Sequence, residues 1–203
     1  MRFDMHTSSP RHDQGRRRRL GAALAALCLA GAGLLPAAPV AAAAPMAAST
    51  ERVQAAYLHR FLNYVEWPLA VLAQADTPYV IGVAGDDTVA DELARIAAGR
   101  SVNNRGVIVK RVLPGDTVNN LHMLFIGGAE HTRLAQWLRM TKGRPVLTVS
   151  ATEGGLDQGS IINFQTIDGR VRFEVSVDAA EQGGLRLNSR LFSVATNVVK
   201  GSR

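Results

Sequence analysis

The spacing of hydrophobic positions changes along the chain, and each spacing predicts a type of element. Helical spacing between residues 50 and 65 predicts a helix that Thr50 caps and that Pro68 ends. Further helices are expected after Asp86 or Asp87 and around Trp137. Short apolar runs predict buried strands at residues 79–84, 102–113, 123–126 and 145–149. This alternation of strands and helices favours an α/β protein, a single compact sandwich domain whose mixed, mostly parallel sheet is covered by helices.

The strongest local signal is Asp168-Gly169, which stands between two runs of alternating hydrophobic and polar residues. A type I′ turn needs positive φ at both central residues, so this dipeptide predicts an antiparallel hairpin with a two-residue loop, at the C-terminal edge of the sheet. The loop sets Phe164 opposite Phe173 and divides the hairpin into two faces. The apolar face holds Ile162, Phe164, Val171, Phe173 and Val175, and the polar face holds Asn163, Gln165, Arg170, Arg172 and Glu174.

The chain after the hairpin predicts two further helical segments. A helical turn is expected from Asp178 to Gln182, ended by Gly183-Gly184. Asn188 is then expected to cap a final helix, because hydrophobic residues recur after it at helical spacing. The apolar face of that helix would hold Leu191, Val194, Ala195 and Val198.

The polar hairpin face and the loop before it form the candidate partner-binding surface. The candidate residues are Glu153, Asn163, Arg170, Arg172 and Glu174. An ordinary solvated face is the simpler interpretation, because many antiparallel sheets expose one charged side. The glycine-rich loop 154–160 contains no Lys and precedes no helix, so it is not a phosphate cradle. Two interpretations of this loop stay open: a tight turn into the hairpin, or backbone amides that line a recognition cleft.

Residues 1–43 predict a signal peptide that is cleaved, followed by a short Ala-rich linker at 44–50 and one domain at 51–200. A basic run at 16–19 precedes an apolar segment, and Val40-Ala41-Ala42 is a small-residue cleavage pattern. The apolar segment is rich in Ala and Gly and is interrupted by Pro36, so it falls short of the ~20 strongly apolar residues of a membrane span. The domain is therefore expected outside the cytoplasm.

Charge and side-chain chemistry narrow the classes of function. Six of the 23 basic and two of the 17 acidic residues precede position 49. The rest of the chain therefore has 17 basic and 15 acidic residues, a net charge of +2. No basic run remains, which excludes nucleic-acid binding. Cys28, the only cysteine, lies in the leader, so a thiol nucleophile is excluded. His59, His122 and His131 lie on different expected elements, so we assign no metal ligand, catalytic residue or cofactor; an unrecognised hydrolase stays an alternative.

Several motifs, taken in order, resemble the YfiR family of small periplasmic regulators. They are Tyr57-Leu58-His59-Arg60-Phe61, Tyr64-Val65-Glu66-Trp67-Pro68, Tyr79-Val80-Ile81-Gly82-Val83, Leu124-Phe125-Ile126, and then the block Leu147 to Val199 with its hairpin. The resemblance covers roughly Glu51 to Lys200. Some members carry cysteines thought to couple function to redox state, but the domain expected here has none.

The resemblance implies a non-enzymatic, periplasmic negative regulator. YfiR-like proteins hold an inner-membrane diguanylate cyclase inactive by binding its periplasmic sensor domain, which limits c-di-GMP signalling and biofilm formation. They are in turn sequestered by an outer-membrane, peptidoglycan-binding lipoprotein. We expect such partners here, together with a homodimer. The alternative is a periplasmic small-molecule-binding accessory domain for another envelope sensor, such as a hybrid kinase.

Overall fold

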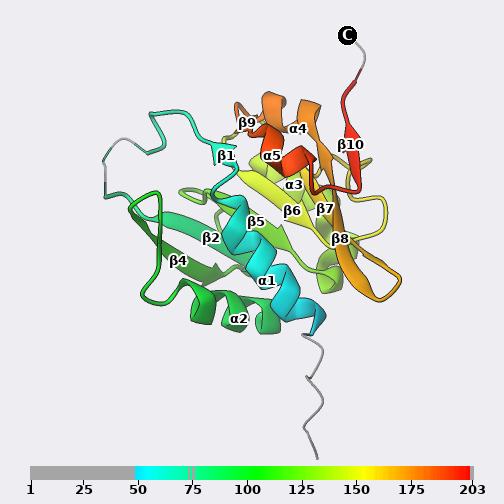
Figure 1. Ribbon diagram of the computed structural model, residues 1–203, viewed down its shortest axis with the longest axis horizontal. Coiled ribbons are helices and arrows are strands. Elements are labelled where there is room, and N and C mark those ends of the chain that lie inside the picture. The colour runs from blue at the N-terminus through cyan, green and yellow to red at the C-terminus, as the bar shows by residue number, and fades with distance from the viewer. Residues whose placement is uncertain (1–48, 73, 75, 202–203) are drawn as a thin grey trace, which may run out of the picture. The chain divides into compact units, whose positions relative to one another are not determined.

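A mixed eight-stranded sheet forms the centre of the computed structural model, which describes residues 49–72, 74 and 76–201 (Figure 1). The expected signal peptide and most of the expected linker lie outside these residues. The strand order is β10-β8-β7-β6-β5-β2-β4-β3. The strands are β2 (Tyr79–Ala84), β3 (Ser101–Val102), β4 (Arg105–Arg111), β5 (Met123–Ile126), β6 (Leu147–Ser150), β7 (Ile162–Ile167), β8 (Arg170–Ser176) and β10 (Asn197–Val199).

The middle of the sheet is parallel, as the continuous apolar runs predicted. Strands β4, β2, β5, β6 and β7 run parallel, while β8 is antiparallel to β7 and β3 is antiparallel to β4. Every residue of β5 and β6 is buried, because helices cover both faces there. A separate two-stranded sheet pairs β1 (Val65–Glu66) with β9 (Arg186–Leu187).

The sheet divides the core into two layers, and helices cover the layer on each face. On one face, α1 (Thr50–Phe61) and α2 (Asp87–Ala97) cover the larger cluster, which includes Leu58, Leu93 and Phe125. On the other face, the short helix η1 (Gly128–Arg133) leads into α3 (Leu134–Thr141), which buries Leu134 and Trp137. Figure 1 shows α1 and α2 in front of the sheet and α3 behind it. Two short helices, α4 (Val177–Gln182) and α5 (Ser189–Phe192), follow the hairpin.

The first helix forms where the spacing predicted it, with different ends. The side chain of Ser49 caps it by accepting a hydrogen bond from the backbone N–H of Arg52, so Thr50 is the first helical residue and not the cap. The helix ends at Phe61, before Pro68 could end it, because Val65 and Glu66 are extended and pair with β9. At α2, Asp86 is the cap, since its side chain accepts from the N–H of Val89.

The expected strand at 102–113 is in fact a small hairpin. Asn103 and Asn104 both have positive φ, 50° and 62°, and they join β3 to the longer β4. Asn tolerates this left-handed conformation better than most residues. The Asn103-Asn104 dipeptide therefore indicates a turn between two strands, which the hydrophobic pattern alone did not predict.

The C-terminal hairpin is confirmed in type and in register. Asp168 and Gly169 have φ of 50° and 70°, as a type I′ turn requires. Phe164 lies opposite Phe173 in the ladder. The five residues of the predicted apolar face are all buried: Ile162, Phe164, Val171, Phe173 and Val175.

The expected final helix is wrong beyond its first turn. Asn188 caps α5 as predicted, but α5 ends at Phe192. The chain then forms β10, which pairs in parallel with β8 and takes the outermost position beyond the hairpin. Thr196 initiates this pairing, because both its N–H and its hydroxyl donate to the carbonyl oxygen of Phe173, at 2.9 and 2.8 Å.

Candidate functional site

A row of polar residues crosses the α3 side of the sheet at the base of the hairpin. Ser150 on β6 is aligned with Asn163 on β7, and Asn163 is aligned with Glu174 on β8. Aligned residues of neighbouring strands point to the same face, so the three side chains meet. Ser150 Oγ donates to Asn163 Oδ1 at 2.8 Å, and Asn163 Nδ2 donates to Glu174 Oε1 at 3.1 Å.

Asn163 is the centre of this row. Only 1% of its surface is exposed, although the alternation placed it on the polar, outward face. Its Oδ1 also accepts a hydrogen bond from the backbone N–H of Thr152 at 3.3 Å. Asn163 therefore ties the start of the glycine-rich loop to the hairpin and holds Glu174 in place.

The polar face becomes exposed toward the hairpin tip. Arg172, aligned with the half-buried Gln165, is exposed, and so is Arg170, aligned with Ile167. Glu174 is half-buried. No ion pair joins Arg170 or Arg172 to another residue of the described chain. The arrangement leaves two exposed guanidinium groups without an ion-pair partner among the described residues, both on strand β8.

The glycine-rich loop lies directly over the polar row. Gly155 is buried, and a β-carbon there would come within 2.5 Å of Asn163 Oδ1, so only glycine fits this contact. Gly154 and Gly159 turn the chain with φ of 66° and 107°. Glu153 is exposed at the start of the loop and forms no ion pair with Arg170 or Arg172. The structure thus brings Asn163 and Glu174 together and leaves Glu153, Arg170 and Arg172 as separate exposed groups around them.

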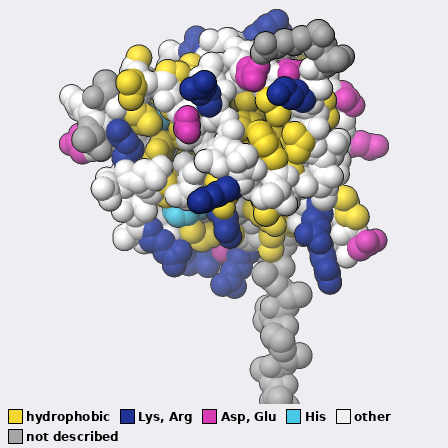
Figure 2. Space-filling model, turned by 45° about the horizontal axis from the view of Figure 1, so that its top comes forward, with side chains coloured by type: hydrophobic (Ala, Val, Ile, Leu, Met, Phe, Trp, Pro, Cys, Tyr) yellow, Lys and Arg dark blue, Asp and Glu magenta, His cyan; other side chains and the backbone are white. Residues whose placement is uncertain are grey.

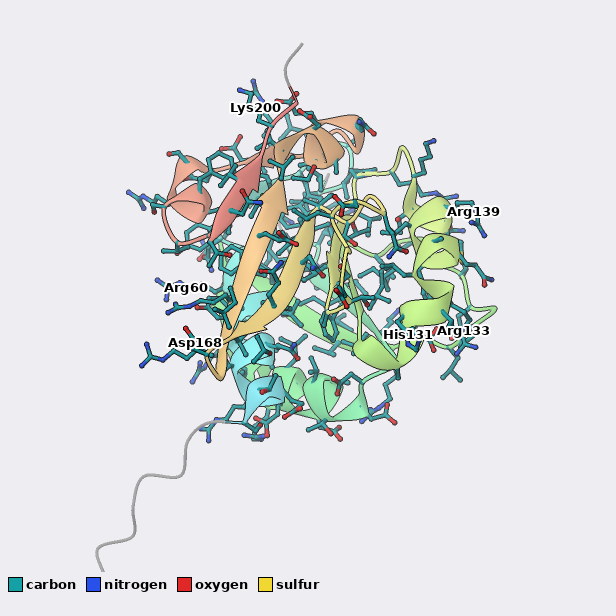
Figure 3. The ribbon with its side chains drawn as sticks, turned by 90° about the vertical axis from the view of Figure 1, so that its right-hand side faces the viewer. Arg60, His131, Arg133, Arg139, Asp168 and Lys200 are labelled. Atoms are coloured by element: carbon teal, nitrogen blue, oxygen red, sulfur yellow. The ribbon has the colours of Figure 1, made fainter. Side chains whose placement is uncertain are left out.

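A cleft continues the same face beyond the loop. It has a volume of about 460 Å³ and lies between the loop, α3 and α4. Leu156 and Gln158 of the loop line one side, so the loop is both a tight turn and a cleft wall. The other lining residues include three cations and one carboxylate: Arg139, Lys142, Arg144 and Asp178. Figure 3 shows α3, with Arg139 labelled, on the opposite side of the sheet from Arg60 of α1.

A buried carboxylate anchors the helix that forms the cleft wall. Glu130 accepts two hydrogen bonds of 2.7 Å from Arg133 and one of 2.9 Å from Trp137 Nε1. The Arg133 hydrogen bonds lower the pKa of Glu130 below its ordinary value, against the opposing effect of burial. Glu130 stays ionised as a result and fixes η1 against α3.

An aromatic cluster supports the hairpin from behind. Phe164 and Phe173 pack against Tyr57 and Phe61 of α1, with ring centroids 5.0 to 6.0 Å apart. These rings cover the face opposite the arginines, so the polar face is presented by a fully packed support.

Comparison with known proteins gives the family. The sequence profile described as YfiR/HmsC-like matches residues 51–196, which is most of the chain and nearly all of the described part. The chain belongs to the YfiR/HmsC-like family. This family is regulatory and not catalytic, and membership indicates a periplasmic regulator of c-di-GMP signalling. No curated protein matches the chain.

Two negative observations bear on the site of this YfiR/HmsC-like protein. Among residues 49–72, 74 and 76–201, no three His, Cys, Asp or Glu residues lie close enough to hold a metal ion. In that same part of the chain, no helix is both long and apolar enough to cross a bilayer. Neither observation identifies a partner.

Sequence reasoning missed two parts of the site. Ser150 ends a buried apolar strand, and a polar residue at that position was a signal for a hydrogen-bonded partner. The cleft had no such signal, because its walls come from α3, α4 and the loop, which are distant in sequence.

Proposed function

We propose that this YfiR/HmsC-like protein inhibits an inner-membrane diguanylate cyclase by binding its periplasmic sensor domain. The binding surface comprises Glu153, Arg170, Arg172 and Glu174, with Asn163 as the buried support. Inhibition limits c-di-GMP synthesis and biofilm formation. The protein acts by binding alone and needs no catalytic step.

The observation that carries this proposal is the pair of exposed arginines on β8, Arg170 and Arg172, which form no ion pair within the described chain. Arginine is enriched in protein interfaces, and a desolvated arginine at an interface often contributes 2 kcal/mol or more. An acidic patch on the sensor domain would complement the two arginines and the cations that line the cleft. Hydrogen bonds of Asn163 and aromatic packing behind the hairpin support the backbone that carries the two arginines, which lowers the entropy cost of binding.

Release of the cyclase follows from competition. A second partner that binds the inhibitor lowers its free concentration and shifts the cyclase toward the uninhibited state. An outer-membrane, peptidoglycan-binding lipoprotein is the partner proposed for this role, by analogy with the family.

A homodimer is the proposed assembly. Figure 2 shows hydrophobic side chains near the C-terminal end of the described chain, among charged ones. Val194, Val198 and Val199 are exposed there, and β10 lies at the sheet edge. Edge strands with exposed apolar residues pair readily with another chain. Light scattering after size exclusion is expected to give twice the monomer mass for the wild-type protein. The Val198→Lys variant is expected to give the monomer mass.

The proposal is tested by deletion and complementation. Deleting the gene is expected to raise cellular c-di-GMP and biofilm mass, and the wild-type gene is expected to reverse both effects. Arg172→Glu is expected to fold normally, as judged by its circular dichroism melt, and to fail in complementation. Binding of the purified variant to the cyclase's periplasmic domain is expected to weaken at least tenfold, a loss of about 1.4 kcal/mol or more.

Arg52→Glu is the matched control, because it makes the same charge change on α1, on the other face of the sheet. It is expected to complement fully. If deletion leaves c-di-GMP unchanged in cells that contain the cyclase, the cyclase proposal fails and another envelope sensor, such as a hybrid kinase, takes its place. If deletion acts but Arg172→Glu complements, the regulator stands and the proposed surface is wrong.

A further inference from the structure

The cleft between α3, α4 and the glycine-rich loop has an excess of positive charge in its lining. Arg139, Lys142 and Arg144 line it together with a single carboxylate, Asp178. All three cations are exposed, so a molecule that enters from solvent can contact them. The volume of about 460 Å³ is within the range of binding sites. A cleft with this balance of charge attracts anionic groups.

The cations of the cleft are not neutralised by neighbouring carboxylates. Arg139 and Lys142 form no salt bridge with any residue that the structure describes. Arg144 donates a hydrogen bond to the side chain of Asn119, which is neutral. The positive charge of all three side chains is therefore available to a ligand.

The one carboxylate of the lining already has a hydrogen-bond partner. Asp178 lies in the first turn of α4, and its Oδ2 accepts a hydrogen bond from the backbone N–H of Gly201. It forms no salt bridge within the described chain. An anionic ligand in the cleft thus meets three positive charges and one negative charge.

The wall formed by α3 has the dimensions of a short extended peptide. Its lining residues Ala135, Leu138, Arg139 and Lys142 recur at helical spacing, so they lie on one side of the helix. With a rise of 1.5 Å per residue, this wall is about 10 Å long. Arg139 and Lys142 are three residues apart, which places their β-carbons about 5–6 Å from each other. Side chains on one side of an extended peptide repeat about every 7 Å, close to this spacing.

The opposite wall is suited to an apolar side chain. Leu156 of the glycine-rich loop lines this wall and is half-buried. The buried Ile161 also lines the cleft. In an extended peptide the residue between two acidic residues points the opposite way from them. An apolar residue at that position would therefore face the loop while its neighbours face α3.

We propose that this cleft binds an extended acidic peptide segment of a protein partner, with acidic residues at alternate positions and an apolar residue between them. The acidic side chains pair with Arg139 and Lys142, and the apolar side chain packs against Leu156. The assignment of this segment to the cyclase's sensor domain rests on the function proposed above. It adds a second contact region to that interface, beyond the loop from Arg170 and Arg172.

The probe is the peptide acetyl-Glu-Leu-Glu-amide, with acetyl-Gln-Leu-Gln-amide as its uncharged counterpart of nearly the same shape. Both are titrated to about 10 mM, above the ~1 mM dissociation constant of a weak ligand. The sample is ¹⁵N-labelled protein purified from cells that express the complete 203-residue sequence. The acidic peptide is expected to shift the backbone amides of Gly143, Gly159 and Gly183, which line the cleft after α3, in the loop and after α4. The glutamine peptide is expected to bind about tenfold more weakly, because it forms no charge-assisted pairs.

Lys142→Glu and Lys110→Glu form a matched pair of variants. Both reverse one exposed lysine charge, but Lys110 lies on β4 and does not line the cleft. Lys142→Glu is expected to weaken binding of the acidic peptide about tenfold, since attraction becomes repulsion. Lys110→Glu is expected to leave it unchanged.

Two kinds of result would overturn the cleft as an acidic-peptide site. One is the absence of shifts at the highest concentration, or shifts centred on Arg170 and Arg172 instead of the cleft. The other is equal affinity for the two peptides, or equal weakening by the two lysine variants. The peptide titrations use wild-type protein, so their outcome does not depend on whether a variant folds.

Binding to the cyclase's periplasmic domain separates this inference from the proposed function. The assignment to the sensor domain is supported if Lys142→Glu weakens that binding about tenfold and Lys110→Glu does not. If both variants bind the domain as wild type does, the assignment fails and the proposed function stands. If wild type itself does not bind the domain, the proposed function and the assignment fail, while the peptide titrations still decide whether the cleft takes an acidic segment.

Discussion

The two faces of the hairpin β7–β8 are held by different interactions, although they belong to the same two strands. One face packs Phe164 and Phe173 against the rings of α1. The other face relies on the hydrogen bonds of Asn163 to Ser150 and Glu174 at its base. At its tip, Arg170 and Arg172 form no ion pair with any residue that the structure describes. The aromatic face thus provides stability, while the polar face combines a fixed base with exposed charges that are available for binding.

This difference predicts which substitutions disturb folding and which disturb binding. Apolar burial contributes in proportion to the area removed from water, so losses on the aromatic face are large. A hydrogen bond contributes less in net terms, but a buried group left without its partner is costly. Exposed charges contribute little to folding, and their loss is seen in association with a partner.

The largest effect is expected from Phe173→Ala. The side chain is 1% exposed and contacts both Tyr57 and Phe61, so truncation leaves a cavity. We expect a loss of about 3–5 kcal/mol in the free energy of unfolding, measured by urea denaturation. A loss below about 1 kcal/mol would contradict the packing of this face.

A smaller loss is expected from Asn163→Ala. The change removes the acceptor for Ser150 Oγ and for the N–H of Thr152, and it leaves Glu174 without its donor. We expect a loss of about 1–3 kcal/mol. Hydrogen exchange of the Thr152 amide is expected to speed up in the same variant. Gln165→Ala, at the next outward position of the strand, is the control and is expected to cost less than about 0.5 kcal/mol.

A pH-dependent loss is expected from Glu130→Gln, on the same side of the sheet as the polar row. The folded-state pKa of Glu130 is lowered by Arg133, so the ionised carboxylate stabilises the fold above its ordinary pKa of 4.5. That contribution disappears as the pH falls from 4.5 through the lowered folded-state value. Wild type is therefore expected to be more stable than the variant at pH 7, with the difference shrinking in acid. A constant difference between pH 7 and pH 3 would show that the carboxylate's charge is not the cause.

The smallest effect on folding is expected from Arg172→Ala. The side chain is exposed and has no ion-pair partner in the described chain, so the loss is expected to stay below about 0.5 kcal/mol. Thermal melts of this variant and wild type are expected to overlap. A loss comparable to that of Phe173→Ala would mean that the two faces do not differ as described.

Local structure was predictable where short-range rules decide it. The Asp168-Gly169 turn needs positive φ at two successive residues, and few dipeptides adopt this conformation, so the turn and the register of Phe164 with Phe173 followed from the sequence. The buried parallel strands followed from their continuous apolar runs. The caps followed to within a residue, because Ser, Asp and Asn satisfy free N–H groups wherever a helix begins.

Only the tertiary structure decided what each residue of the site contacts. Period-two alternation placed Asn163 outward, but the loop that contains Gly155 folds over it and buries it. Hydrophobic spacing after Asn188 suits a helix, yet the backbone of β8 offers a free edge, and the chain pairs with it through Thr196 as β10. The cleft beside α3 depends on segments far apart in the sequence. In each case long-range contacts outweigh local preference, because the free energy of burial and pairing depends on which segments meet, and a local pattern contains no information about that.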